Sequence, residues 1–303
     1  MKKVNKRSVT LGSLAAIGCE GLYGLSYIFT KQGTDQASVL ALLGWRFLVA
    51  FIVMSALIVV GIVHIDLRGK SLKPLLLVSL FNPVLYFVGE TAGISHTSAS
   101  ESGVFLACIP VVSLLASTWI LKKRPSRQQV VGILITLVGV ILTVIAAGTQ
   151  TSLSIIGYAF LLLAVGTYAL YSVFVEKAAA YTGIEITYLM LAAGALVFSV
   201  LALVEAAGKG EVGTLLSLPM VNGKFLEAVL YQGIGSSVIA LFLSNFAIAE
   251  MGVNRTSSFI GISTVVSIIA GILVLGEQFN GYQLLGAVVI ILGVYIANKT
   301  IKL

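Results

Sequence analysis

The chain has 303 residues, of which 58% are hydrophobic and only 10% are charged, and its mean hydropathy is +1.05. Soluble domains have about a quarter of their residues charged, so this composition excludes a water-soluble globular protein and predicts an integral membrane protein. The formal net charge of +7 does not indicate nucleic-acid binding, because the basic residues lie between apolar stretches and form no patch with interleaved aromatic residues. We interpret them as determinants of membrane topology.

The first apolar run, residues 9–30, follows four basic residues and therefore resembles a signal peptide. It is longer than the apolar region of a signal peptide, and nine further apolar runs follow it. We therefore expect it to be retained as the first membrane-spanning helix.

Ten apolar runs, each bounded by charged residues, glycine, proline or polar clusters, predict an all-α membrane protein with ten transmembrane helices. They cover residues 8–31, 37–63, 72–94, 98–121, 126–147, 153–176, 184–205, 226–248, 254–276 and 279–298. If the amino terminus is cytoplasmic, fifteen of the nineteen Lys and Arg residues fall on the cytoplasmic side and three on the opposite side. The positive-inside rule then predicts a multi-pass protein of the cytoplasmic membrane with both termini inside.

The two halves of the chain resemble each other. At an offset of 154 residues, Gln129, Gly132, Gly139 and Val140 match Gln283, Gly286, Gly293 and Val294, and residues 111–113 match 265–267. At an offset of 145, Tyr23 and Phe29 match Tyr168 and Phe174. We therefore expect two five-helix repeats, residues 8–148 and 151–298. An odd number of helices inverts the second copy and places a substrate site near the midplane between the copies. Chance similarity between apolar segments is the alternative.

The matched glycines lie seven residues apart, which is two helical turns, in both 126–147 and 279–298. Each pair forms a stripe of small residues that lets its helix approach a neighbouring helix closely. Pairing of two chains through these stripes, and therefore a homodimer, remains open.

Glu20 lies near the middle of the first predicted helix, where an ionisable side chain costs about 2.5 to 3.5 kcal/mol on insertion scales. Helical spacing puts it on one polar and aromatic face with Tyr23, Tyr27 and Lys31, and we expect this face to line a cavity. A buried carboxyl group binds a proton more readily than one in water, so Glu20 is a candidate for proton coupling. A static ion pair with Arg46 is the alternative.

The second and third predicted helices contain two more ionisable residues. Arg46, next to Trp45, is a candidate for binding a solute carboxylate through its guanidinium group, with a structural tether as the alternative. Glu90 shares a helical face with Tyr86, and we expect it to face the cavity or to reach the outer interface.

Glu101 and Arg255 occupy equivalent positions in the two repeats and form a possible gate. A capping box that begins at Ser98 explains Glu101 better, because a glutamate at the third helical position satisfies a free amide.

In the sixth predicted helix, Tyr168 and Tyr171 are candidates to complete a binding site. Polar residues of the eighth helix are candidates too, although ordinary hydrogen bonding between helices explains them as well: Gln232, Ser237, Ser244 and Asn245.

The sequence resembles the drug/metabolite transporter superfamily in its ten-helix form with two EamA-type domains. The resemblance lies in Tyr23-Gly24-Leu25-Ser26 with Lys31, Arg46-Phe47, Ile109-Pro110-Val111-Val112, and Leu275-Gly276-Glu277 followed by Gly286 and Gly293. The sequence departs from the family pattern where Tyr23 replaces a frequent Trp, Lys122-Lys123-Arg124 replaces Gly-Glu, and Thr264 replaces the second Pro. The resemblance implies export of amino acids or related compounds.

These features predict a secondary active transporter that moves a small polar or amphipathic solute, amino-acid-like or cationic, by alternating access, most simply as a proton-coupled exporter. A facilitative exchanger without proton coupling and a non-transporting membrane sensor or scaffold are the alternatives. We expect no enzyme, no cofactor and no metal site, because the two histidines and two cysteines have no ligand spacing. Gly69-Lys70-Ser71 does not complete a phosphate-binding loop, because His64 stands where its first glycine belongs.

Overall fold

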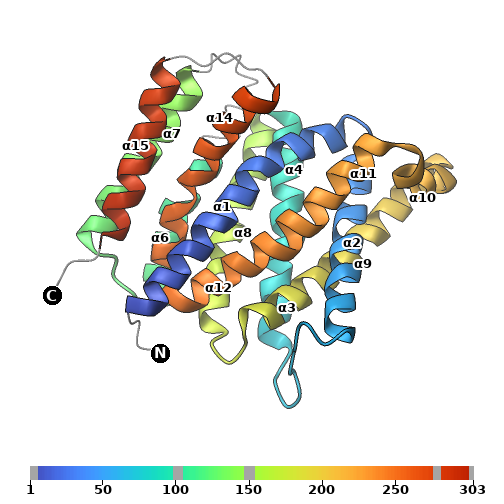
Figure 1. The fold of residues 1–303 in the computed structure, drawn as a ribbon, viewed down its shortest axis with the longest axis horizontal. Coiled ribbons are helices and arrows are strands. Elements are labelled where there is room, and N and C mark those ends of the chain that lie inside the picture. The colour runs from blue at the N-terminus through green and yellow to red at the C-terminus, as the bar shows by residue number, and fades with distance from the viewer. Residues whose placement is uncertain (1–5, 98–104, 147–153, 276–280, 300–303) are drawn as a thin grey trace.

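The computed structural model describes residues 6–97, 105–146, 154–275 and 281–299, and every regular element in these ranges is a helix (Figure 1). The first half contains α1 (Lys6–Thr34), α2 (Val39–Val59), α3 (Lys73–Ser79), η1 (Leu80–Leu85), α4 (Tyr86–His96), α6 (Ile109–Ile120) and α7 (Arg127–Ala146). The second half contains α8 (Ile155–Lys177), α9 (Gly183–Lys209), α10 (Val212–Val221), α11 (Gly223–Leu230), η2 (Tyr231–Ala240), α12 (Leu241–Met251), α13 (Val253–Thr256), η3 (Ser257–Phe259), α14 (Gly261–Leu275) and α15 (Gly281–Asn298). The all-helical prediction is confirmed for this part of the chain.

Within the described residues, seven helical segments are long and apolar enough to cross a membrane. They are Val39–Val59, Lys73–Gly93, Ile155–Lys177, Gly183–Lys209, Gly223–Met251, Val253–Gly271 and Gly281–Asn298. Three shorter apolar helices cover Phe105–Ile120, Arg127–Thr143 and Val212–Val221. The 29-residue helix α1 is not among the seven, because Glu20 and several glycines and serines lower its hydropathy.

Side-chain caps fix where several helices begin. Ser38 Oγ accepts a hydrogen bond from the Ala41 amide at 3.2 Å and starts α2, and Ser154 does the same for α8. Asn222 Oδ1 accepts from the Phe225 amide at 3.0 Å, so α11 begins at residue 223, three residues earlier than the predicted helix 226–248. The reason is that the cap satisfies amides that a helix start leaves free.

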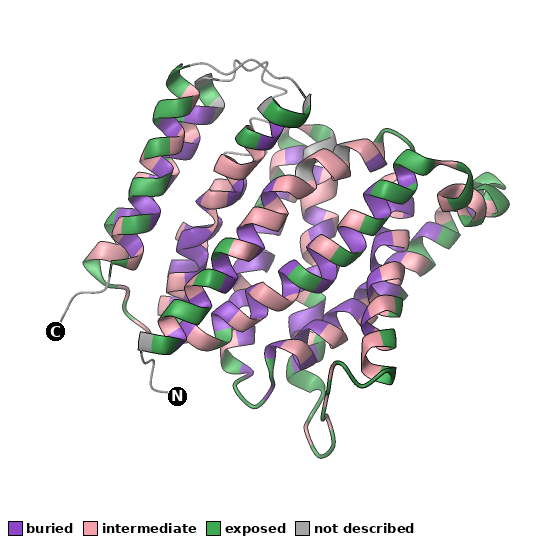
Figure 2. Ribbon diagram, in the orientation of Figure 1, coloured by how far each residue is buried: buried purple, intermediate pink, exposed green. Residues whose placement is uncertain are grey.

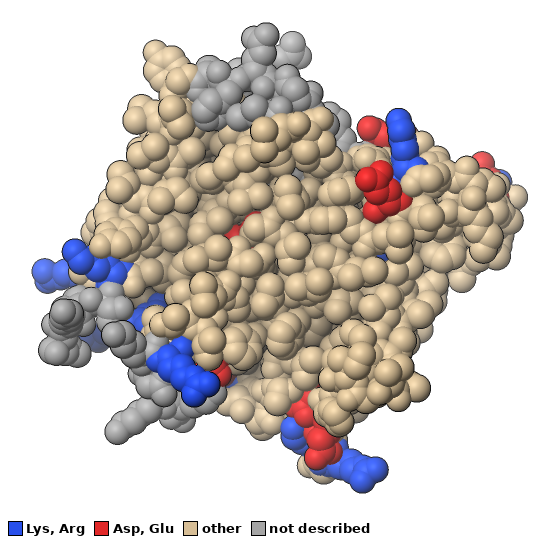
Figure 3. All heavy atoms as spheres, viewed as in Figure 1, with Lys and Arg blue, Asp and Glu red and all other residues tan. Residues whose placement is uncertain are grey.

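The outer surface is apolar between two charged ends. Figure 2 places most buried residues in the middle of the bundle, while large apolar side chains such as Leu196 (68% exposed) and Leu273 (79%) point outward. In Figure 3 the charged side chains lie near the edges of the visible face, basic and acidic together at the upper right and along the bottom and mainly basic at the left, with a broad uncharged surface between them. An apolar surface of this extent is stable against lipid but not against water.

Helices α7 and α15 lie side by side at one edge of the bundle (Figure 1). A Cβ atom on Gly139 would lie 2.7 Å from the Ile290 amide nitrogen, and one on Gly286 would lie 2.7 Å from Thr143 Cγ2. The glycine stripes therefore pack against each other within one chain, which leaves these faces unavailable for pairing with a second copy.

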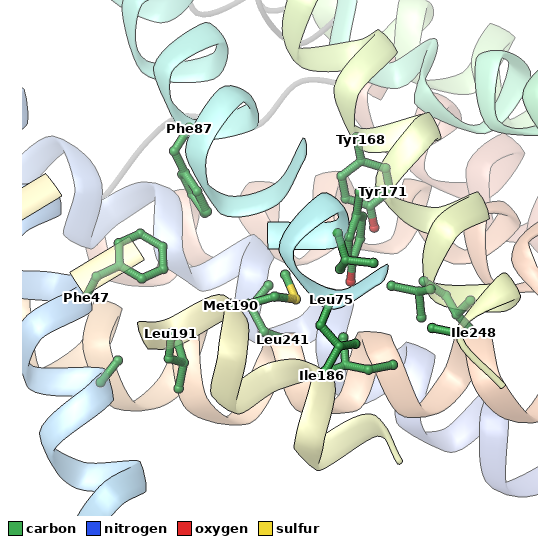
Figure 4. Packing of buried hydrophobic residues seen from close by; sticks show 14 of the residues in the cluster. Phe47, Leu75, Phe87, Tyr168, Tyr171, Ile186, Met190, Leu191, Leu241 and Ile248 are labelled. Carbon is green, nitrogen blue, oxygen red and sulfur yellow. The ribbon is translucent and has the colours of Figure 1, made fainter. Parts of the chain in front are cut away.

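The main apolar core joins both halves of the chain (Figure 4). Phe47 of α2 packs edge-on against Phe87 of α4, with ring centroids 5.4 Å apart, and stacks on Phe198 of α9 at 5.3 Å. Tyr171 of α8 and Met190 of α9 are fully buried in the same cluster. This core fixes α2 and α4 relative to the second half.

Two of the apolar segments depart from regular α-helix. Residue Asn82 in η1 has extended backbone angles (φ −145°, ψ 120°), which breaks the segment that runs from α3 to α4. The corresponding segment of the second half, between α11 and α12, has π-helical turns over Tyr231–Ala240. Irregular turns of this kind occur frequently at functional sites because they place polar groups inside the bundle.

Candidate functional site

A cavity of about 120 Å³ lies between the two halves of the chain. Its walls come from α1, α2, η1, α4, the start of α6, α7, α8 and residues 260–264. Of the side chains singled out by the sequence, six line this cavity: Glu20, Tyr23, Arg46, Tyr86, Glu90 and Tyr168. The structure therefore brings together residues that are up to 148 positions apart.

Glu20 reaches the cavity from the middle of α1 and is only 5% exposed. Helix α1 packs tightly on α14, since a Cβ atom on Gly24 would lie 2.6 Å from the Ser263 carbonyl oxygen. This close approach brings Ser263 and Thr264 into the cavity wall beside Glu20.

Arg46 enters the cavity from α2 and is 6% exposed. Its Nε donates a hydrogen bond to Ser237 Oγ at 2.7 Å, and its guanidinium carbon lies 4.4 Å from the ring centroid of Phe87. Within the described part of the chain, no carboxylate lies within salt-bridge distance of Arg46 and its terminal nitrogens donate to no other residue. The static ion pair with Glu20 is therefore wrong, and a tether to Ser237 takes its place.

Glu90 and Tyr86 form a pair one helical turn apart on α4. The Tyr86 hydroxyl donates to Glu90 Oε1 at 2.7 Å, and the Tyr86 ring packs edge-on against Phe87 and Tyr168. Glu90 lies close enough to Arg46 to interact with it electrostatically, without direct contact. The carboxylate of Glu90 thus faces the cavity, which is one of the two positions that the sequence left open.

Two predicted site residues lie outside the cavity wall. The Trp45 indole donates to the Leu215 carbonyl at 3.0 Å and packs in a separate cluster with Phe225. Tyr171 is fully buried behind Tyr168 and donates to Asn245 Oδ1 at 2.7 Å. Both are packing residues because their helices turn these side chains toward neighbouring helices. The polar residues of the eighth predicted helix likewise bond to other helices rather than to the cavity.

Two sequence candidates have little or no description in the structure, and a third is described away from the cavity. The side chain of Tyr27 and the whole of Glu101 lie outside the described residues. Arg255 belongs to α13, is half-buried, and does not line the cavity. The gate formed by Glu101 and Arg255 therefore remains a sequence-based hypothesis.

Several cavity residues were missed by the sequence analysis, among them Asn82 and Leu106. Asn82 is 2% exposed, and its Oδ1 has no hydrogen-bond partner among the described residues. The sequence did contain a signal for Asn82, which is a polar residue directly before Pro83 in an apolar segment. A proline inside a helix breaks it, and the residue before the proline is then displaced from the helical conformation. Leu106 carried no signal, since one apolar residue among many does not show which residues it will contact.

The cavity combines one guanidinium, two carboxyl groups and three tyrosines in an environment largely shielded from water. A guanidinium fork suits a carboxylate, and a carboxylate suits an ammonium group. Within the described residues, no cluster of His, Cys, Asp and Glu is able to hold a metal ion. The arrangement therefore fits reversible binding of a small charged or zwitterionic solute.

Comparison with known proteins places these features in context. The model of the EamA-like transporter family matches residues 10–145 and again residues 155–299. Among similar proteins is the uncharacterized transporter YcxC of Bacillus subtilis (strain 168), 32% identical over 98% of this chain and 96% of its own length. The uncharacterized transporter YyaM of the same organism is 26% identical over 92% and 91%. The WAT1-related protein At1g44800 of Arabidopsis thaliana is 22% identical over 92% and 81%.

A solved crystal structure has the same fold. It superposes with a TM-score of 0.72 at 18% sequence identity and covers 96% of this chain and 97% of the other. At this identity the likeness concerns the fold alone.

Proposed function

Because this chain belongs to the EamA-like transporter family and is a multi-pass membrane protein, we propose that it is a secondary active transporter for small zwitterionic or cationic metabolites. The single observation that carries the proposal is the orientation of Arg46. Its terminal nitrogens have no partner among the described residues, and they lie in a cavity that also contains Glu20 and Glu90.

The proposed architecture is ten crossings in two inverted five-helix repeats, residues 8–148 and 151–298. Two matches of one family model support the repeat, since they divide the chain at almost the same point. The three crossings beyond the seven long apolar segments are α1, residues 105–120 and α7. With a cavity between the two repeats, rocking of one repeat against the other exposes it to alternate sides of the membrane.

The proposed solute has a carboxylate, an ammonium group, or both. The Arg46 fork would bind the carboxylate, and the carboxyl groups of Glu20 and Glu90 would bind the ammonium group. Tyr86, Phe87 and Tyr168 would cover the apolar part of the solute, since their rings border the same cavity.

We assign proton coupling to Glu20 because its carboxyl group is buried and forms no ion pair with a described basic residue. Binding of a proton would neutralise Glu20 and release an ammonium group from it, so one site would bind proton and solute in turn. If Glu20 binds a proton and releases the solute on the outer side, and loses the proton and binds solute on the inner side, entering protons drive export of the solute.

The proposed location is the cytoplasmic membrane with both termini inside. Both described chain ends lie at the same end of the bundle in Figure 1, and basic side chains gather near them in Figure 3. Basic residues mark the cytoplasmic ends of membrane proteins.

Proteoliposomes test the function directly. Counterflow of amino acids and small organic amines would be measured for the wild type, with and without an imposed pH gradient. We expect saturable exchange of a zwitterionic or cationic solute that responds to the gradient. Exchange without a gradient response would identify a facilitative exchanger, and no exchange by any member of a broad panel would favour a sensor or scaffold.

A further inference from the structure

We propose that Ser237 is a positioning residue that aims the Arg46 guanidinium at the carboxylate of the transported solute. The proposal rests on the proposed function, because it concerns the same cavity. Ser237 is fully buried in η2 of the second half, and its hydroxyl accepts the Arg46 Nε–H at 2.7 Å. It does not line the cavity itself.

Two contacts determine the orientation of the guanidinium plane. Ser237 holds its Nε edge, and Phe87 lies under its face at 4.4 Å. A guanidinium group is planar, so contacts to one edge and one face determine the direction in which its two terminal nitrogens point. That direction is the cavity, since Arg46 lines it and the described residues take no other hydrogen bond from the side chain.

The backbone around Ser237 is held in place by other contacts. A Cβ atom on Gly233 would lie 3.1 Å from the Arg46 carbonyl oxygen, so η2 packs directly on α2. Gln232 Nε2 donates to the Ser26 carbonyl of α1 at 2.9 Å and also to Thr30. The position of η2 therefore does not depend on the hydroxyl of Ser237.

The neighbouring residue provides a matched control. Ser236 is also fully buried in η2, but its Oγ has no hydrogen-bond partner among the described residues. Ser236→Ala and Ser237→Ala remove the same atom from adjacent positions. Only the second change frees the Nε edge of Arg46, so any difference between them reports on Arg46.

The test compares carboxylate-bearing solutes with their decarboxylated amines. The apparent Kd would be measured from the ligand-induced shift in Tm of the purified full chain, using L-phenylalanine with phenethylamine and L-leucine with isoamylamine. We expect Ser237→Ala to raise the Kd of the bound amino acid about tenfold, which corresponds to the loss of one charge-assisted hydrogen bond. The Kd of the amine should stay unchanged, Ser236→Ala should alter neither, and Ser237→Thr should restore the amino-acid affinity.

The outcomes separate the two proposals. If the wild type binds neither amino acid, the carboxylate-bearing solute class is wrong and the role of Ser237 is overturned with it. If the wild type binds an amino acid and Ser237→Ala binds it equally well, only the role of Ser237 is overturned. If the affinities for acid and amine fall together, Ser237 is merely structural and the proposal is also overturned.

Glu176, near the end of α8, is bonded at both carboxylate oxygens: Oε1 accepts from Lys123 Nζ, and Oε2 accepts from the Val253 amide at 2.7 Å. Its side chain is only 12% exposed. The turn before Val253 contains Gly252 (φ +81°), where a Cβ atom would lie 3.2 Å from Glu176 Oε2. Glycine is needed there both for this φ and for the close approach of the carboxylate.

We infer that this contact is a latch that holds one end of the cavity together. Lys123 follows α6, whose start lines the cavity with Ile109 and Pro110. Val253 begins the segment that leads to the cavity residues 260–264. Glu176 therefore joins the far end of α6 to the segment that leads to residues 260–264. These two elements come from different halves of the chain and each contributes to the cavity wall, so release of Glu176 would let them separate.

The repeat offsets relate each partner of this ion pair to an oppositely charged residue in the other half of the chain. An offset of 145 relates Lys31 to Glu176, and an offset of 154 relates Lys123 to Glu277. The basic and acidic partners are thus exchanged between the two copies. The side chains of Lys31 and Glu277 lie outside the described residues, and the latch concerns Lys123, Glu176 and Val253 alone.

Thiol labelling tests the latch without any knowledge of the solute. Cys19 and Cys108 are replaced by alanine, and Ala107→Cys places a reporter in the cavity wall. A membrane-impermeant maleimide is applied to inside-out and right-side-out vesicles. From the side that bears the termini, we expect Glu176→Gln to increase the labelling rate severalfold, because glutamine keeps an acceptor for Val253 but loses the ion pair.

Lys123→Gln breaks the same ion pair from its other partner and should give the same increase. Lys209→Gln is the control, because Lys209 pairs with Glu205 one turn away on the same helix and this ion pair joins no two segments. Equal labelling of the latch variants, the control and the unmodified reporter would overturn the latch.

Discussion

Arg46 and Glu20 line the same cavity, yet no salt bridge joins them, and Arg46 is held instead by Ser237 and Phe87. The two charged groups therefore do not neutralise each other. Insertion of an ionisable side chain at the centre of an apolar helix costs about 2.5 to 3.5 kcal/mol on insertion scales. A function in the cavity explains why both groups are present despite this cost.

Glu20→Gln should abolish the response of transport to a pH gradient, because glutamine keeps the size and hydrogen-bonding capacity of the side chain but binds no proton. Solute counterflow, which needs no net proton movement, should continue. The measurement is counterflow in proteoliposomes with and without an imposed gradient. Glu227→Gln is the control, since Glu227 accepts from Gln32 away from the cavity. A gradient response that survives in Glu20→Gln would assign coupling to another group.

Arg46→Lys should raise the KM for a carboxylate-bearing solute at least tenfold, because an ammonium group lacks the planar fork and the Nε–H that binds Ser237. The KM of a decarboxylated amine should change little. Initial rates of counterflow for both solutes give this comparison. An equal effect on acid and amine would show that Arg46 does not bind the carboxylate.

Trp45→Phe, at the neighbouring position, should leave the KM of every solute unchanged, because Trp45 does not line the cavity. The loss of its hydrogen bond to the Leu215 carbonyl should cost about 1 kcal/mol of stability. Thermal unfolding in detergent and counterflow, measured on the same preparation, check both parts. A KM change as large as that of Arg46→Lys would contradict the observed position of Trp45.

Gly139→Ala should destabilise the pairing of α7 with α15 by about 1 to 3 kcal/mol, because its Cβ would lie 2.7 Å from a backbone nitrogen of α15. Gly166→Ala, in α8, is the control, since a Cβ there meets no atom within 4 Å. It should leave Tm unchanged or raise it slightly through helix propensity. Equal Tm values for the two variants would mean that the close contact of α7 and α15 is absent in the membrane protein.

Asn245→Leu should destabilise the fold by about 1 to 3 kcal/mol, because it leaves the buried hydroxyls of Tyr171 and Thr187 without their amide partner. Ser199→Ala should be nearly neutral, since the Ser199 hydroxyl is buried without a partner among the described residues. A double-mutant cycle of Asn245→Leu with Tyr171→Phe should show coupling between the two sites. Additive effects would argue against their hydrogen bond.

The sequence by itself determined the class of the protein and the charged part of its candidate site. High hydropathy and apolar runs of helical length predict an all-helical membrane protein, since a helix alone satisfies every backbone group within one segment in lipid. Glu20, Arg46 and Glu90 stood out because ionisable residues in such runs are rare and costly. All three line the cavity.

Only the tertiary structure decided which of the aromatic candidates line the cavity and which residues hold its charged groups. Trp45 follows the chain next to Arg46, but consecutive helical residues point about 100° apart, and Trp45 packs on Leu215 instead. Ser237 and Phe87 contact Arg46 from other segments, and Ser237 is 191 positions away. The sequence indicates Ser237 as one of four polar candidates in the eighth predicted helix, but nothing in the sequence shows which of them contacts Arg46. Contacts of this kind depend on how the helices pack, because local periodicity specifies which face is polar but not which residue of another helix meets it.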